Sequence, residues 1–300
     1  MHAKFLPNVR QRPRPLEAPA TSQTGTMRLQ SCAATSSHPN KFTAPEAAQN
    51  SVYLSIRWFY FQVLSRDASG GGTVSDGMSD GNPYKDESHM RAFSSSGLHR
   101  DAVGGLWDEL GSLQLEFLKQ CGLRPEHKFL DLGCGSLRAG VALAPHLAPG
   151  NYYGVDLSAW LIECGRKELD DLGLGSRIPE ENFKVNDTFD LTGFPKFDFA
   201  IAQSVFTHMP ISEFSRCLRR IRSHFTSGGR FYATFFVAPH GVEAKKQEPG
   251  GVVSYSHKDP FHFPVEDVIV AAMAEGWRAR WIGDWDHPRN QQMCLLTYGL

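Results

Sequence analysis

The stretch FLDLGCGSLRAG, residues 129–140, constrains the fold of this chain more than any other. Residues 129–132 are apolar apart from one carboxylate, which is typical of a buried parallel strand that ends at the carboxyl edge of a sheet. Gly133 and Gly135 follow, and they predict a tight turn that a ligand can approach closely, because no Cβ stands in the way. Apolar residues at helical spacing come next. A strand, a glycine turn and a helix are the first half of a βαβ unit of the kind that binds nucleotides.

The glycine spacing argues against a dinucleotide as the ligand. A dinucleotide fingerprint needs G-x-G-x-x-G, whereas Arg138 stands at the third glycine position here. Asp131, just before the first glycine, would repel a pyrophosphate and attract a cationic amine. S-adenosylmethionine carries an ammonium and a sulfonium and no phosphate. Asp-Leu-Gly-Cys-Gly therefore resembles motif I of the class I S-adenosylmethionine-dependent methyltransferases, with an ordinary strand-to-helix turn as the alternative.

Two further predicted strands also end in an acid. Asp156 closes the strand 151–156, and it follows the glycine turn at about the 20-residue offset that delivers an acid to a ribose diol. A cap on the next helix is the alternative for this residue. Asp187 closes the strand 182–187. Ligands of open α/β sheets bind outside the carboxyl ends of the strands, so these acids and Asp131 together predict a binding site at that edge.

The rest of the chain alternates strand and helix patterns. Further strands are predicted at 197–202, 230–237, 277–282 and 292–298, and the last two form a hairpin. The alternation indicates an α/β, doubly wound, mostly parallel sheet. The methyltransferase resemblance implies a Rossmann-like fold of seven strands with an antiparallel last strand. Residues 239–264 are polar and are predicted as a long loop.

Composition divides the chain at about residue 85. Residues 1–50 are basic and rich in Pro, Ser and Thr, and such a segment cannot bury enough apolar surface to offset its ordering entropy. Residues 69–83 have the composition of a flexible Gly/Ser-rich linker. We therefore predict a disordered tail over residues 1–84. An organelle transit peptide or an over-extended reading frame would give the same composition.

The methyltransferase domain is predicted over residues 85–300, with a helical lead-in or lid over 85–126 and the Rossmann-like core over 127–300. In the lead-in, apolar residues between Leu106 and Leu118 follow helical spacing. A later helix is predicted to bury one apolar face, formed by Phe214, Cys217, Leu218, Ile221 and Phe225.

Charge, cysteines and hydropathy exclude several kinds of partner. A formal net charge of −1 offers no basic footprint for nucleic acid. The six cysteines form no C-x-x-C pair, so we expect free thiols in the cytoplasm rather than a disulfide scaffold or a zinc site. Ser51–Leu64 is apolar but shorter than the roughly 20 residues that a membrane-spanning helix needs. For this reason no membrane partner is expected. The histidines of the loop 239–264 lack the spacing of metal ligands, so no metal is expected either.

Longer strings extend the resemblance. NYYGVDLS, FDFAIAQSVFTHM and TSGGRFYATFF are similar to the later strand motifs of class I methyltransferases, while HRDAVGGLWDELGSLQ and DWDHPRNQQM resemble a group of bacterial methyltransferases whose substrates are mostly unassigned. The resemblance implies S-adenosylmethionine as the cofactor. It assigns the cofactor to residues at the strand ends: the methionine end to Asp131, Gly133 and Gly135, the ribose to Asp156, the adenine to Asp187, and the methionyl part with its methyl group to Gln203. Arg138 would neutralise the cofactor carboxylate or point outward.

One residue carries the prediction about the acceptor. Methyl transfer is an in-line attack on a sulfonium, so the protein has to position the nucleophile and, for a hydroxyl, remove its proton. His208, just past the strand 197–202, is the candidate base, and a helix-start residue that packs or caps locally is the alternative. The N/D-P-P-Y/W/F tetrad of amino-directed DNA methyltransferases is absent after that strand. We therefore expect methyl transfer to a small-molecule hydroxyl, with an inactive cofactor-binding partner subunit or a nicotinamide-dependent dehydrogenase as alternatives, and no indication of oligomeric state.

Overall fold

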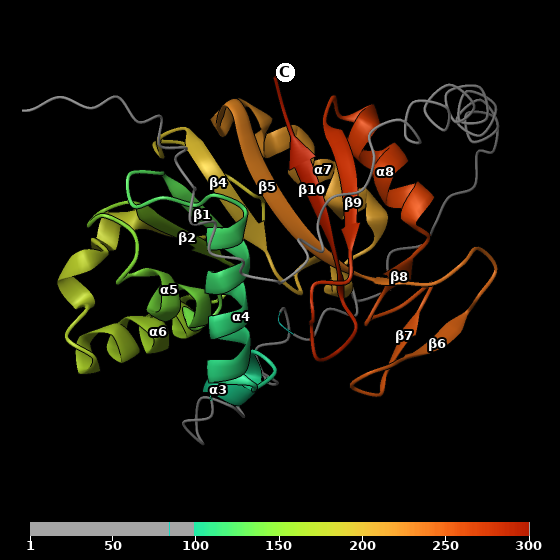
Figure 1. Ribbon diagram of the computed structural model, residues 1–300, viewed down its shortest axis with the longest axis horizontal. Coiled ribbons are helices and arrows are strands. Elements are labelled where there is room, and N and C mark those ends of the chain that lie inside the picture. Colours follow the sequence, from blue (N-terminus) through green and yellow to red (C-terminus); the bar gives the residue numbers. More distant parts are fainter. Residues whose placement is uncertain (1–83, 85–98, 300) are drawn as a thin grey trace, which may run out of the picture. The chain divides into compact units, whose positions relative to one another are not determined.

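The computed structural model describes Tyr84 and residues 99–299, which belong to one compact unit, Pro45–Leu300. The predicted tail, residues 1–84, lies outside the described residues apart from Tyr84, and so does the start of the predicted lead-in, residues 85–98. The described residues form a central sheet with helices on both of its sides (Figure 1).

The sheet has the order β3-β2-β1-β4-β5-β10-β9. β10 runs antiparallel to both of its neighbours, and the other pairs are parallel. This confirms the predicted doubly wound, mostly parallel sheet with an antiparallel last strand. The strands along this order are β3 (Phe183–Val185), β2 (Tyr152–Asp156), β1 (Phe129–Leu132), β4 (Phe197–Ala202), β5 (Phe225–Val237), β10 (Gln292–Thr297) and β9 (Arg278–Gly283).

The helices of the described part gather in two groups. α4 and α6 both contact α5, and α7 packs with α8. Among residues 99–299, no helix has the length and hydropathy needed to cross a membrane. The helices are α3 (His99–Ala102), α4 (Trp107–Gln120), α5 (Arg138–Leu143), α6 (Ala159–Asp171), α7 (Ile211–Ile221) and α8 (Val265–Ala274), with short 3₁₀ turns at η4 (Gly175–Arg177), η5 (Glu180–Asn182), η6 (Phe206–His208) and η7 (Arg222–His224).

The strand order reverses beside β1. β2 and β3 lie on one side of β1, while β4 and β5 lie on the other. β1 is buried along its whole length, and its Asp131 is in register with Gly154 of β2 and Ile201 of β4. Since the three strands are parallel, their carboxyl ends share one edge, and the reversal opens a crevice there.

The predicted end of α7 is wrong. The helix ends at Ile221, and Phe225 begins β5, which was predicted to start at residue 230. Phe225 is buried against the ring of Phe197, with the ring centroids 6.4 Å apart. It lies four residues after Ile221, so an apolar residue of the strand keeps the helical spacing by coincidence, and periodicity does not distinguish the two cases.

The predicted loop 239–264 contains a hairpin and a short strand. β6 (Ala244–Gln247) pairs antiparallel with β7 (Val252–Tyr255), and β8 (His262–Phe263) pairs with the end of β5. The interior of the hairpin is polar, because Nε2 of Gln247 donates to Oγ of Ser254 at 2.8 Å and both residues are fully buried. Polar side chains that satisfy one another leave no apolar alternation, which is why these strands escaped the sequence pattern.

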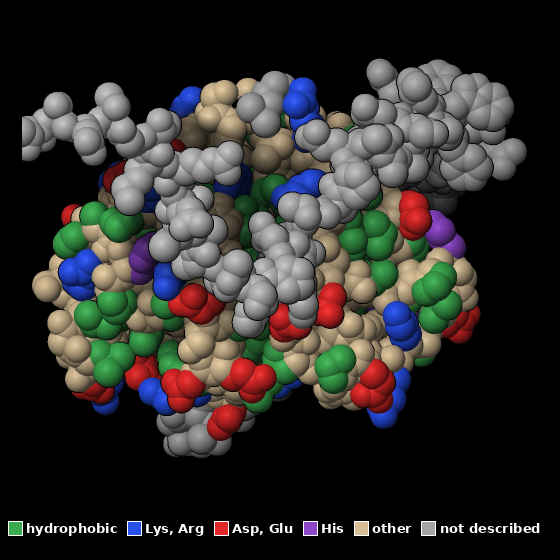
Figure 2. Space-filling view, in the orientation of Figure 1, with side chains coloured by type: hydrophobic (Ala, Val, Ile, Leu, Met, Phe, Trp, Pro, Cys, Tyr) green, Lys and Arg blue, Asp and Glu red, His purple; other side chains and the backbone are tan. Residues whose placement is uncertain are grey.

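The surface carries charges of both signs. On the face seen in Figure 2, acidic and basic side chains are interspersed over the part of the molecule below the grey residues. Several form exposed ion pairs, such as Lys119 with Glu116 at 2.9 Å and Lys246 with Glu248 at 2.5 Å. Pairs of this kind contribute little to stability because water screens them.

Gly165 of α6 lies directly on the glycine turn. A Cβ there would stand 2.4 Å from Cγ of Leu137 and 2.5 Å from the carbonyl oxygen of Ser136, and backbone does not yield as a flexible side chain does. We expect Gly165→Ala to lower the free energy of unfolding, measured with urea, by about 1–3 kcal/mol or more. Gly111→Ala in α4 is the matched control, because its Cβ would meet no atom closer than 3.6 Å. The stability of Gly111→Ala should stay unchanged or rise. Equal losses in the two variants would show that contact with the glycine turn is not what requires glycine at position 165.

Candidate active site

A cleft opens at the carboxyl ends of β1, β2 and β4. It consists of a larger cavity of about 750 Å³ and a smaller cavity of about 630 Å³, which share Gly133, Asp156 and Val205 among their lining residues. The structure brings all seven residues predicted from the sequence to this cleft. Asp131, Gly133, Gly135, Asp156, Gln203 and His208 line the larger cavity, and Asp187 lines the smaller one.

The glycine turn depends on backbone that glycine tolerates best. Gly133 and Gly135 have φ angles of 75° and 52°, in the left-handed region. A Cβ on Gly133 would stand 2.4 Å from Cγ2 of Val205. The N–H groups of Gly133 and Cys134 both donate to the carbonyl of Val155, at 2.7 and 3.0 Å. The turn is therefore tied to the end of β2, and it leaves no room for a side chain at Gly133 beside Val205.

Asp156 holds the turn in place from β2. Its Oδ2 accepts from the backbone N–H of Gly135 at 2.8 Å, and its Oδ1 accepts from the N–H of Ser158 at 2.9 Å. The cap of α6 is Ser158, whose Oγ accepts from the N–H of Leu161 at 3.3 Å. The helix-cap alternative for Asp156 is therefore wrong. Burial raises the pKa of Asp156, although these N–H groups act in the opposite direction.

Asp131 is a buried carboxylate at the end of β1. Only 4% of it is exposed, and the hydroxyl of Tyr152 donates to its Oδ2 at 2.6 Å. Burial raises its pKa to about 7, against the opposing effects of Tyr152 and the charge of Arg138. A carboxyl group in this state gains from a cationic ligand, because a nearby positive charge favours the ionised form.

Arg138 at the start of α5 does not point outward. Its Nη1 donates to the carbonyls of Val103 and Gly105 at 3.3 and 3.0 Å, so it holds the segment between α3 and α4 against the cleft. Burial lowers its pKa to about 10, which leaves it charged at neutral pH. Its Nε is buried and finds no hydrogen-bond partner among the described residues.

Gln114 of α4 is a cleft residue that sequence reasoning missed. It is 2% exposed and lines the larger cavity, and its Oε1 has no hydrogen-bond partner within the described part of the chain. A buried acceptor without a donor costs about 1–3 kcal/mol, so this atom is suited to a ligand donor. The signal in the sequence was a polar residue on the buried stripe of α4, between Leu110 and Phe117.

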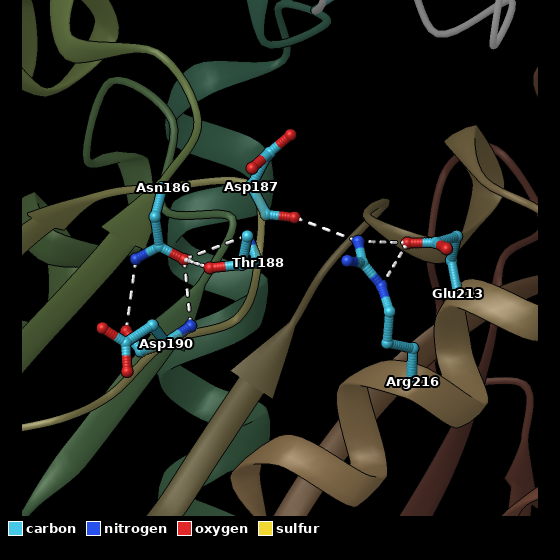
Figure 3. Close-up of polar contacts among 6 residues, drawn as sticks. All are labelled: Asn186, Asp187, Thr188, Asp190, Glu213 and Arg216. Carbon is cyan, nitrogen blue, oxygen red and sulfur yellow. Dashed lines mark hydrogen bonds and ion pairs between the residues drawn. The ribbon is translucent and has the colours of Figure 1, made fainter.

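Asp187 lies in the loop after β3 rather than in the strand. β3 ends at Val185, and the side chain of Asn186 shapes the following turn by accepting from the N–H groups of Thr188 and Asp190 at 3.1 and 3.0 Å (Figure 3). The carbonyl of Asp187 accepts from Nη2 of Arg216 at 3.1 Å. Its exposed carboxylate points away from Arg216 (Figure 3).

His208 ends the 3₁₀ turn η6 and lines both cavities. Its Nδ1 lies 2.8 Å from Oδ1 of Asp259, a residue of the segment between β7 and β8. That segment is anchored beside η6, because the N–H of Phe261 donates to the carbonyl of Thr207 at 2.7 Å. His208 is thus a cleft residue held by a carboxylate, and it precedes α7 rather than packing within it.

Asp259 and Tyr84 are further residues that sequence reasoning missed. Asp259 lies in the predicted loop 239–264, and no local pattern indicates its contact with His208, which spans 51 positions of the chain. The ring of Tyr84 meets that of His208 edge-on, with the centroids 5.1 Å apart, and its hydroxyl donates to the carbonyl of Ala102 at 3.0 Å. Burial, with the charges of Asp156 and Asp259, raises the pKa of Tyr84. In residues 99–299 and Tyr84, no cluster of three acidic, histidine or cysteine side chains is arranged to hold a metal ion.

Comparison with known families points to one class of protein. Residues 130–231 match the model of a family described as a methyltransferase domain. The match begins one residue into β1, covers the glycine turn, Asp156 and His208, and extends into β5.

Solved structures share the fold at low identity. A magnesium protoporphyrin IX methyltransferase from Synechocystis PCC 6803, with bound SAM, is 17% identical over 75% of this chain and 100% of that one, with a TM-score of 0.50. A S-adenosylmethionine-dependent methyltransferase from Clostridium acetobutylicum ATCC 824 is 13% identical over 70% and 99%, with a TM-score of 0.50. A complex of DhpI with SAH is 21% identical over 74% and 99%, with a TM-score of 0.52.

Proposed function

Because this chain contains a methyltransferase domain and has the class I S-adenosylmethionine-dependent methyltransferase fold, we propose that it transfers a methyl group from S-adenosylmethionine to a hydroxyl oxygen of a small molecule. The observation that carries the choice of oxygen is that Nδ1 of His208, a residue lining the cleft, lies 2.8 Å from Oδ1 of Asp259. A hydroxyl has to lose its proton during the attack, and a histidine with a carboxylate partner is suited to accept it. A neutral amine needs no such base.

The unpartnered atoms of the larger cavity fit the amino-acid end of the cofactor. The unpartnered Oε1 of Gln114 would accept from its ammonium, as would the carboxylate of Asp131, and the unpartnered Nε of Arg138 would donate to its carboxylate. Asp156, at the boundary of the two cavities, would take the ribose, and Asp187 in the smaller cavity would take the adenine amino group. When bound, the cofactor supplies an electrophilic methyl group.

The protein contributes position and a proton acceptor. When Nδ1 of His208 donates its proton to Asp259 in a hydrogen bond, Nε2 keeps a lone pair. That lone pair can receive the hydroxyl proton of the substrate. Asp259 would stabilise the imidazolium that forms. Tyr84 covers the edge of the His208 ring and would limit water at the site. Tyr84 stands at the boundary predicted between the tail and the domain over residues 85–300, so in this proposal the functional domain includes Tyr84.

The experiment is transfer of labelled methyl groups from S-adenosylmethionine into pools of hydroxylated and aminated small molecules, with products identified by mass spectrometry. O-methylated products are expected. N-methylated products alone would contradict the proposal, and binding of S-adenosylhomocysteine without transfer would favour an inactive partner subunit.

Asp156→Asn serves to test the ribose contact. The variant keeps one of the two acceptors that hold the backbone N–H groups of Gly135 and Ser158 and loses the charge, and charge-assisted hydrogen bonds contribute about 1.5–3 kcal/mol each. We expect S-adenosylhomocysteine to bind roughly ten- to hundredfold more weakly by calorimetry. Asp171→Asn, at the exposed end of α6, is the control and should bind normally. An unchanged affinity in Asp156→Asn would show that Asp156 does not bind the ribose.

A further inference from the structure

The connection between β9 and β10 reaches a cleft residue, because Nε2 of its His287 lies 3.4 Å from Nε2 of Gln203. It makes up the first eight residues of the string DWDHPRNQQM, residues 284–293, which continues into β10 and which the cofactor assignments leave without a role. Two of its polar side chains are buried, His287 at 3% and Gln291 at 4% exposure. Buried polar groups persist where they have hydrogen-bond partners, so the partners of these two residues indicate what the segment does.

Gln291 fixes the turn that follows β4. Its Oε1 accepts from Oγ of Ser204 at 3.0 Å and from Oγ1 of Thr234 at 2.7 Å. Thr234 in turn accepts from the backbone N–H of Ser204 at 2.8 Å, and Ser204 has a φ of 59°. This left-handed residue directly follows Gln203, so the connection holds Gln203 at its place in the larger cavity.

The ring nitrogen Nδ1 of His287 faces a hydrogen-bond donor. The backbone N–H of Arg289 donates to Nδ1 of His287 at 3.1 Å, so Nδ1 carries a lone pair. Burial, with the positive charges of Arg138 and Arg289, lowers the pKa of His287 to about 3, and the ring is therefore neutral at physiological pH. A neutral imidazole carries one ring proton, which then resides on Nε2.

The amide of Gln203 is the group that this Nε2–H faces. Nε2 of Gln203 lies 3.4 Å from Nε2 of His287, which would set two donors against each other. Oε1 of Gln203 meanwhile is buried without a partner among the described residues. A half-turn of the amide about its last bond exchanges its oxygen and nitrogen. It gives the His287 proton an acceptor and turns the NH₂ group toward the larger cavity.

We propose that His287 is a positioning residue: its Nε2–H donates to Oε1 of Gln203, so that the Gln203 NH₂ group faces the larger cavity as a donor for the carboxylate of the cofactor. The inference rests on the proposed function for the identity of the ligand. Gln203 and Arg138 line the same cavity, and the unpartnered Nε of Arg138 is a second donor there. The amino-acid end of the cavity thus divides into donors, Gln203 and Arg138, and acceptors, Gln114 and Asp131.

The tautomer is tested on the ligand-free wild-type protein. A long-range ¹H–¹⁵N correlation spectrum distinguishes a protonated from an unprotonated ring nitrogen, and His287 is assigned by comparison with His287→Asn. We expect the proton on Nε2 and a neutral ring at pH 7. A proton on Nδ1 would overturn the proposal. This measurement involves no cofactor, so it stands even where S-adenosylhomocysteine fails to bind the wild type, which would count against the proposed function instead.

The carboxylate is tested with two ligands, S-adenosylhomocysteine and its decarboxylated analogue. His287→Asn removes the Nε2–H, and S-adenosylhomocysteine should bind about ten- to hundredfold more weakly, while the affinity of the analogue should stay unchanged. His287→Gln places an amide N–H where Nε2 was and should recover most of the lost affinity. Equal losses for both ligands would show a merely structural role and would overturn the proposal, as would no loss at all. His224→Asn, in the turn η7 away from the cleft, is the control for both ligands.

Discussion

Asp131→Asn is expected to make the ligand-free protein more stable at pH 8 while strongly weakening its affinity for S-adenosylhomocysteine. The pKa of Asp131 is raised from 3.8 to about 7. An acid whose folded-state pKa is raised contributes most to stability below its unfolded pKa, and stability falls as pH rises through the window from about 4 to 7. At about 1.36 kcal/mol per unit of pKa, ionisation costs on the order of 4 kcal/mol. Asparagine avoids this cost and still accepts from Tyr152.

The binding side of this prediction comes from the lost charge. Removing one partner of a buried charge pair costs about 2–5 kcal/mol, roughly thirtyfold to a few thousandfold in affinity. The wild type at pH 7 should also release protons to the buffer when S-adenosylhomocysteine binds, because the ligand ammonium favours the ionised carboxylate. Calorimetry in buffers of different ionisation enthalpy measures this release, which the variant should lack.

Asp190→Asn is the matched control for stability. The pKa of Asp190 is lowered by hydrogen bonds from Thr192, which is the opposite direction, and the residue is absent from the lining of the cleft within the described chain. Its asparagine variant should not gain stability at pH 8. A drop in the stability of Asp131→Asn at that pH, or an affinity equal to that of the wild type, would contradict the assignment of Asp131.

His208→Ala is expected to lower turnover by about 10²–10⁴ while leaving the affinity for S-adenosylhomocysteine intact. His208→Gln should not rescue it, because an amide holds geometry but does not take the proton. Asp259→Asn keeps a hydrogen-bonding partner for His208 and removes its charge, so turnover should fall by less than in His208→Ala. Rates are measured on an acceptor found in the methyl-transfer screen, and affinities by calorimetry.

His240→Ala is the control for the base. His240 is exposed and lies 3.6 Å from Asp267, outside the cleft, so its loss should leave turnover unchanged. Near-normal turnover in both His208 variants would show that positioning alone drives transfer. A loss of cofactor affinity equal to the loss of turnover would instead place His208 among the binding residues.

The first βαβ unit was predicted well because its signals are local. A strand, two glycines and an apolar helical face lie within residues 129–144, and each is a statement about neighbours in the chain. The same holds for Asp131 and Asp156, which follow directly from where their strands end. Strands that end at the same edge bring their last residues together without further information.

The sequence did not predict which distant residues contact the cleft and the hairpin. Gln114 lies on α4, which precedes β1 in the chain. Only its burial and its place in the cavity lining show that it belongs to the cleft. The polar hairpin 244–255 has no apolar alternation, since Gln247 and Ser254 are buried on each other. Burial of a polar group becomes favourable only when a distant segment supplies its hydrogen bond, and composition does not record that.

The sequence by itself determined the doubly wound, mostly parallel sheet and the acids Asp131 and Asp156 at the ends of its strands, because hydrophobic period and glycine spacing act over a few residues. The tertiary structure alone decided that Asp259 meets His208, across 51 positions, and that His287 meets Gln203, across 84. Each contact joins a loop residue to a residue that follows β4, and the two partners are far apart in the sequence. Their hydrogen bonds exist only after the sheet has assembled, so no local pattern predicts them.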